Sequence, residues 1–207
     1  MNQFQIPANG YLFRPVKAFY HVPYTRMGKE GNPDYLNDLK NTYDDSPEYT
    51  LKSAQQKLHN TLREDLPQIL RLLGFDPLVV CVVPRAKAEN EYSPNQQLFR
   101  STVQMVIRQM PGFVDGTGYI RRHTTTRTTH FRKPIPNYVN AGPQPYPGIT
   151  RDTCEISPHV KGKHVLLIDD IYTPGVNIDE DAINALFNAG AGTVTFYAVG
   201  RVVREYI

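Results

Sequence analysis

The sequence has few cysteines and no long apolar run. Only Cys81 and Cys154 occur among its 207 residues, in unrelated contexts. Two such cysteines do not suggest a disulfide framework or a zinc site. No apolar run approaches the roughly 20 residues that span a bilayer, and residues 1–4 lack the basic and apolar regions of a signal peptide. We therefore expect a cytoplasmic protein without a membrane partner.

Motifs of several enzyme classes are also missing. The sequence contains no nucleophile elbow, no Walker-type phosphate loop and no His-Glu zinc helix. The formal net charge of +3 is small and favours no class of partner. A chain of 207 residues with 40% hydrophobic residues is expected to form one domain with a sizeable core.

Acidic residues are absent between Asp115 and Asp152, which leaves a local cationic segment. Its basic residues are Arg121, Arg122, Arg127, Arg132, Lys133 and Arg151. The stretch offers few aromatic side chains for base stacking and matches no nucleic-acid-binding module. We therefore do not expect a nucleic-acid partner.

The most informative stretch is residues 165–177. Four apolar residues run directly into Asp169 and Asp170, and a turn containing Gly175 follows. A short apolar run bounded by turn residues predicts a strand buried on both faces. Adjacent carboxylates at its end repel each other and lose hydration, so a ligand is expected there. The carboxyl ends of strands are where open α/β sheets bind ligands.

The turn after the acids suits a phosphate. It leads into a predicted helix whose first amides and dipole favour an anion. The residues therefore predict a ligand shaped like ribose 5-phosphate, with its hydroxyls at Asp169 and Asp170. Its phosphate would lie on Thr173, Pro174, Gly175, Val176 and Asn177. The alternatives are a solvated strand end and a simple helix start, with Asn177 and Glu180 forming a capping box.

Residues 165–177 resemble the phosphoribosyl pyrophosphate (PRPP) signature of type I phosphoribosyltransferases. Within that superfamily, residues 36–40, 92–96 and 161–163 are similar to the ComF group of proteins linked to bacterial competence, and the resemblance covers residues 36–203. The chain departs from the pattern at Pro174, which lacks an N–H, and at Asn177, which replaces a Thr. No cysteine before residue 80 could form the zinc ribbon usual in ComF proteins.

The resemblance implies a type I phosphoribosyltransferase-like α/β fold. We expect a twisted, mainly parallel sheet flanked by helices, an irregular hood over residues 1–35 with one short strand near residues 11–16, and a phosphoribosyltransferase-like domain over residues 36–207. Patterning predicts a helix from Ser46–Pro47 to Gly74, with a break near Pro67, and a capping box at 93–96 that opens a second helix to about residue 110. A third helix is expected over 178–189. Strands are expected over 78–83, over 119–122, where a long loop follows, and over 193–199.

The resemblance also implies site roles. Arg85 and Lys87, in the loop after the strand over 78–83, would hold pyrophosphate, and Asp169 would reach the accompanying Mg²⁺. Arg122 would belong to a flexible loop that closes over the ligand, with Asp169 and Asp170 as its catalytic partners. His123 and His130 could act as acids toward the leaving group. For these histidines the alternative of a solvated loop is favoured.

The implied function is transfer of a phosphoribosyl group between PRPP and a nitrogenous base, with Mg²⁺, in either direction. The alternative is a binding module for PRPP or a nucleotide, or a ComF-like accessory protein in DNA uptake or stress response, without turnover. The sequence does not identify the acceptor base. Oligomeric state stays open, with a homodimer among the alternatives.

Overall fold

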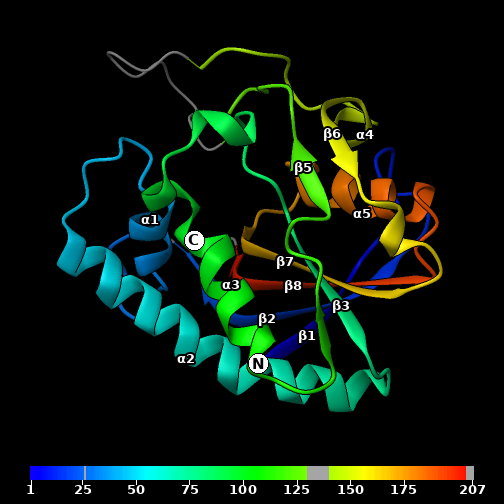
Figure 1. Cartoon of the computed structure of the whole chain (residues 1–207), viewed down its shortest axis with the longest axis horizontal. Helices are drawn as coiled ribbons and strands as arrows, with labels where there is room; N and C mark the ends of the chain where they lie inside the picture. Colours follow the sequence, from blue (N-terminus) through cyan, green and yellow to red (C-terminus); the bar gives the residue numbers. More distant parts are fainter. Residues whose placement is uncertain (26, 130–139, 204–207) are drawn as a thin grey trace.

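A six-stranded sheet forms the centre of the computed structural model, which describes residues 1–25, 27–129 and 140–203 (Figure 1). The strands run in the order β1-β2-β8-β7-β3-β4, and only β1 and β2 pair antiparallel. Their bounds are β1 Asn2–Ile6, β2 Val16–Tyr24, β3 Leu78–Val82, β4 Phe113–Asp115, β7 His164–Tyr172 and β8 Thr193–Val202. The prediction of an α/β fold with a mainly parallel sheet is confirmed.

Helices cover both faces of this sheet, which explains why β3 is apolar at every position. Val80 and Val82 pack with one group of helices, whereas Val79 and Cys81 pack on the opposite face. The first face carries α1 Tyr35–Lys40, α2 Glu48–Leu73 and α3 Leu98–Arg108, and the second carries α5 Ile178–Asn188 (Figure 1). Alternation in a strand buried on both faces therefore sends side chains into two separate cores.

The long helix α2 begins and ends close to the predicted residues. Pro47 is its N-cap, and Gly74 terminates it with a φ of 66°, a left-handed conformation that suits glycine. The predicted break near Pro67 was wrong, because α2 continues through this residue. Leu62, Leu66 and Ile69 are buried around it. Packing of this apolar stripe holds the helix together across the missing backbone hydrogen bond.

The N-terminal residues do not form an irregular hood. That prediction was wrong, because β1 and β2 extend the central sheet beside β8 (Figure 1). The strand predicted near residues 11–16 begins only at Val16 and runs to Tyr24. Pro23 within β2 argues against a strand when the sequence is read alone. Pairing of Ala18 with Phe196 in β8 supplies the stabilisation that the local pattern does not show.

A small second sheet lies at one end of the molecule. It pairs β5 Ile120–Arg122 with β6 Cys154–Ile156, and the short helix α4 Ile149–Thr153 precedes β6. The strand predicted over 119–122 is thus confirmed. The strands predicted over 78–83 and 193–199 correspond to β3 and β8, and the helix predicted over 178–189 to α5. In the described part of the chain, no helix is long and apolar enough to cross a membrane.

Candidate functional site

The strand β7 carries the two carboxylates past the end of its neighbour. The last residue of β3, Val82, pairs with Ile168, so Asp169 and Asp170 extend beyond β3. On the other side, β8 continues alongside, and Asp169 pairs with Ala198. The acids are therefore inside β7 rather than after it, since the strand ends at Tyr172. This difference in strand length leaves open space above β3, at the carboxyl ends of parallel strands.

A cavity of about 510 Å³ occupies this space. Such a volume lies within the range of about 300–1,000 Å³ that is usual for small-molecule sites. It is lined by seven of the predicted site residues, namely Arg85, Lys87, Arg122, Asp169, Asp170, Thr173 and Val176. Pro174, Gly175 and Asn177 do not line it. Residues from three separate stretches of the chain therefore meet at one place.

Asp169 lies beside a second carboxyl group that the sequence did not single out. Burial and the neighbouring Asp170 raise the pKa of Asp169 to about 7. Burial and the Asp169 charge raise the pKa of Asp179, the second residue of α5. Two neighbouring buried carboxyls share a proton more easily than they carry two charges.

Asp170 has a different partner. Its Oδ2 lies 3.1 Å from Nζ of Lys40, the last residue of α1. Burial disfavours the charge on Lys40, but attraction to Asp170 and Asp169 outweighs it and raises the lysine pKa. Lys40 and Asp170 both line the cavity. The ion pair places the Lys40 ammonium beside Asp170, next to the buried Asp169 and Asp179.

The turn after β7 has an unusual backbone. Gly175 has a φ of 84° and Asn177 a φ of 66°, both in the left-handed region. Asparagine tolerates this region far better than the β-branched Thr of the resembled pattern. Asn177 precedes α5 as N-cap, but its side chain does not cap the helix. Its Oδ1 instead accepts a hydrogen bond of 3.1 Å from Asn9.

The alternative interpretation of the turn, a capping box between Asn177 and Glu180, was wrong. Glu180 is buried, and its Oε1 accepts a hydrogen bond of 2.8 Å from the hydroxyl of Tyr172. The side chain is thereby directed away from the helix terminus toward β7. The amides of the first turn of α5 are therefore not occupied by this carboxylate.

The loop after β3 presents two cations to the cavity, as predicted. The guanidinium of Arg85 lies 4.3 Å from the ring centroid of Tyr92, and its Nη1 donates to the carbonyl of Gln96. Gln96 belongs to the predicted capping box with Ser93, which is confirmed. The Gln96 amide also donates to the carbonyl of Asn41 at 3.0 Å, just after Lys40. This network joins the Arg85 loop to the end of α1.

Arg122 is a buried residue of β5 and not a freely projecting side chain. Its Nε donates to the carbonyl of Arg85 at 2.7 Å, and its Nη1 donates to the hydroxyl of Thr153. Burial lowers its pKa. Although Arg122 lines the cavity, these contacts make it a residue that positions the Arg85 loop.

The segment after β5 adds one further cation to the cavity wall. Arg127 lines the cavity, and the nearby Thr126 donates through its N–H to the carbonyl of Ala86 at 2.7 Å. His123 is exposed, and its Nδ1 lies 2.9 Å from the Thr124 hydroxyl. It does not line the cavity. His130 lies outside the described residues.

Lys40 and Asp179 are the site residues that sequence reasoning missed. Lys40 lies within the stretch 36–40 that resembles the ComF group, but no pattern assigned it a role. Asp179 is one of three acidic residues in the first turn of α5, a placement that the helix dipole alone explains. Only the fold brings these two residues to Asp169 and Asp170.

The donor set suits the Mg²⁺ that the resemblance implies. Mg²⁺ takes oxygen ligands and is commonly held by one or two carboxylates together with substrate phosphates. Asp169 and Asp170 supply such oxygens, although Lys40 engages one of them. A metal ion at Asp169 would replace the proton shared with Asp179.

The chain matches no known protein-family model, and no curated protein matches its sequence.

Proposed function

We propose that this protein binds PRPP with Mg²⁺, or the 5′-phosphate of a nucleotide, and transfers a phosphoribosyl group to or from a nitrogenous base. The observation that carries the proposal is the common cavity at the end of β7. Carboxylates and loop cations both line it. The type I phosphoribosyltransferase fold and the ComF resemblance are part of the same proposal, and the mainly parallel sheet is compatible with them.

The ribose would bind at the end of β7. Asp170 lies against Lys40, and its carboxylate can accept hydrogen bonds from sugar hydroxyls. The 5′-phosphate would lie against the turn 173–177, where Gly175 allows close approach of the backbone. Loss of the N–H at Pro174 leaves fewer amides for this phosphate.

The pyrophosphate would lie against the cations of the cavity wall. Arg85, Lys87 and Arg127 line the cavity there, and Arg122 holds the carbonyl of Arg85 in place. In the reaction the bond from ribose C1 to pyrophosphate breaks and a bond from C1 to the base nitrogen forms. Positive charge on C1 and negative charge on pyrophosphate develop together, so fixed cations lower the barrier. Mg²⁺, when bound, supplies further charge neutralisation.

The alternative is a binding module that takes up PRPP or a nucleotide without turnover. Pro174 favours this alternative, because it removes a phosphate donor. The contact of Asn177 with Asn9 favours it also, because it engages the side chain that replaces Thr. A ComF-like accessory role in DNA uptake or stress response belongs to the same alternative.

Calorimetric titration with PRPP and Mg²⁺ tests the proposal, followed by a pyrophosphate-release assay over a panel of bases. We expect saturable binding and base-dependent release. Binding without release for any base would support the module. An absence of binding by PRPP, ribose 5-phosphate and nucleoside monophosphates would contradict both functions.

A further inference from the structure

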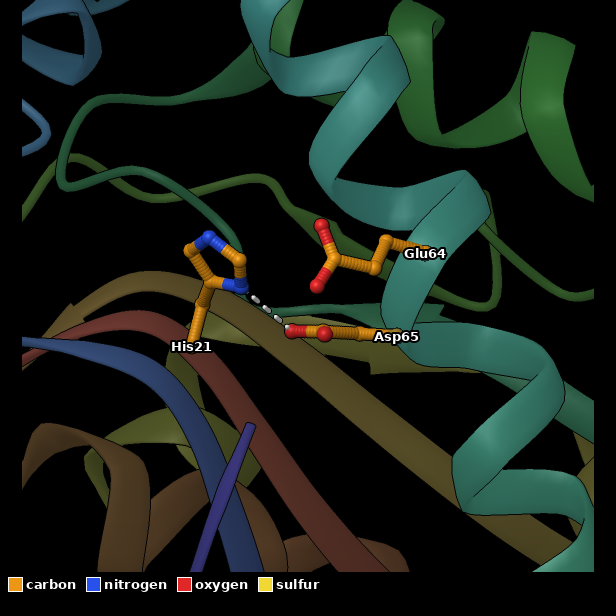
Figure 2. A group of neighbouring side chains, drawn as sticks. All are labelled: His21, Glu64 and Asp65. Atoms are coloured by element: carbon orange, nitrogen blue, oxygen red, sulfur yellow. Dashed lines mark hydrogen bonds and ion pairs between the residues drawn. The ribbon is translucent and has the colours of Figure 1, made fainter.

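A second polar cluster lies away from the cavity, between β2 and α2. It consists of His21 on β2 and the consecutive residues Glu64 and Asp65 on α2 (Figure 2). None of the three lines the cavity described above. The proposed function therefore does not use them.

The three side chains converge. Figure 2 shows the imidazole of His21 and the carboxylate of Glu64 directed toward Asp65. The Nδ1 of His21 lies 3.0 Å from Oδ2 of Asp65. One ligand atom from each residue lies within 4.8 Å of the other two. These atoms come from a strand and a helix that are distant in sequence, so only the fold brings them together.

Asp65 is incompletely satisfied by the protein. Its side chain is fully buried at 0% exposure. Oδ2 accepts a hydrogen bond of 2.8 Å from the Tyr197 hydroxyl and also faces His21. Oδ1 has no hydrogen-bond partner among the described residues. A buried carboxylate oxygen without a partner is costly, and His21 faces the other oxygen, Oδ2.

We propose that His21, Glu64 and Asp65 bind a divalent transition-metal ion, with Zn²⁺ as the best fit. An imidazole nitrogen with two carboxylate oxygens is a ligand set that Zn²⁺ accepts, whereas Mg²⁺ and Ca²⁺ prefer oxygen ligands alone. Zinc–ligand distances of about 2.0–2.2 Å place tetrahedral ligand atoms about 3.4 Å apart. This spacing lies between the 3.0 Å and 4.8 Å that bracket the cluster, so small side-chain rotations suffice.

The surroundings fit such an ion. The Tyr197 hydroxyl orients Asp65, as hydrogen-bond partners of metal ligands commonly do. Glu64 is exposed and the His21 side chain is 23% exposed, so the ion can enter and a water can take the fourth position. The bound ion links β2 to α2 and thereby stabilises the fold.

The test uses the full chain after removal of metal with a chelator. Titration with ZnCl2 is followed by calorimetry and by the melting temperature, with MgCl2 as the comparison ion. We expect one zinc ion per chain, a rise in melting temperature, and no comparable rise with Mg²⁺. His21→Gln and Glu64→Gln should each weaken zinc affinity by about tenfold or more. His59→Gln, the same change on α2 outside the cluster, should leave the affinity unchanged.

Asp65→Asn is not the deciding variant, because it also disturbs Tyr197 and can impair folding. Crystals soaked with zinc and measured at the zinc absorption edge give an independent result, namely an anomalous peak between the three side chains. A peak elsewhere, or equal zinc affinity in His21→Gln and the unsubstituted chain, would overturn the site. PRPP binding is unaffected in either case, so this test is separate from that of the proposed function.

Discussion

Asp169 and Asp170 are chemically alike but have different surroundings. Asp169 lies beside the buried Asp179, and burial raises the pKa of both, whereas Asp170 forms an ion pair with Lys40. Two adjacent carboxyl groups thus have different surroundings, and a carboxyl with a raised pKa that lines a cavity is typical of functional sites. We propose that Asp170 has the main role in holding ribose hydroxyls.

Replacement of Asp170 by Asn tests this role. The change removes a charge-assisted acceptor and should weaken PRPP binding by about 1–3 kcal/mol. Calorimetry measures the affinity, and thermal unfolding without ligand checks the fold. Asp45→Asn, at an exposed position that does not line the cavity, is the matched control. Unaltered affinity together with a large fall in melting temperature would indicate a structural role only.

The Asp169–Asp179 pair predicts a specific dependence of stability on pH. The pKa of Asp169 is raised from 3.8 to about 7, so the folded state retains a proton that the unfolded chain releases above about pH 4. Stability from this pair is therefore lost as pH rises from about 4 to 7. Asp179→Asn removes one of the two charges. It should stabilise the ligand-free protein by about 1–3 kcal/mol at pH 7.5, since one pKa unit corresponds to about 1.4 kcal/mol.

Melting temperatures of both proteins between pH 4 and pH 8 provide the measurement. The two curves should converge near pH 4 and separate toward neutral pH. Parallel curves over the whole range would show that the two carboxyls do not share a proton.

At the residue scale, the sequence alone singled out Asp169 and Asp170 as candidate site residues, but not the residues that lie beside them. Asp169 and Asp170 stand out because a buried apolar run precedes them directly. Lys40 and Asp179 do not, since a lysine ending a short helix and an acid beginning another are ordinary features. Their pairing depends on tertiary contacts that no local pattern carries.

At the scale of the elements, the backbone of the turn after β7 accounts for the Asn at position 177, where the phosphoribosyltransferase signature has Thr. Asn177 adopts a φ of 66°, which asparagine tolerates and a β-branched residue does not. Asn177 lacks the hydroxyl that could bind a phosphate, but it suits the left-handed backbone that the turn requires.

Asn177→Thr should therefore destabilise the protein by about 1–3 kcal/mol through backbone strain. It should not improve affinity for ribose 5-phosphate. Asn177→Gly, which accepts the same backbone conformation, should be much better tolerated. Chemical denaturation of the three proteins measures the differences. Thr and Gly variants of equal stability would refute the strain.

Periodicity was a good guide to elements that pack by their own amphipathic pattern. The 3.6-residue period located α2 and α5, and continuous apolar runs located β3 and β7. The N-terminal strands escaped prediction because their order depends on pairing with β8. The predicted break at Pro67 failed for a related reason, since packing around α2 outweighs one missing hydrogen bond.

For the whole molecule, topology explains the site. The strands β3, β7 and β8 run parallel and end at the same edge of the sheet, and β3 is the shortest there. The cavity above it collects segments from α1, the loop after β3, the region after β5 and the start of α5. Charged groups of both signs meet around one space, which matches a ligand with a polyhydroxylated part and anionic ends.

A crystal structure with ribose 5-phosphate and Mg²⁺ tests the central claim most directly. We predict that the sugar hydroxyls lie within hydrogen-bonding distance of Asp169 or Asp170, with Lys40 displaced or shared. The phosphate should contact backbone amides of residues 173–177. A ligand bound away from the end of β7, or a phosphate held only by Arg85 and Lys87, would contradict the account.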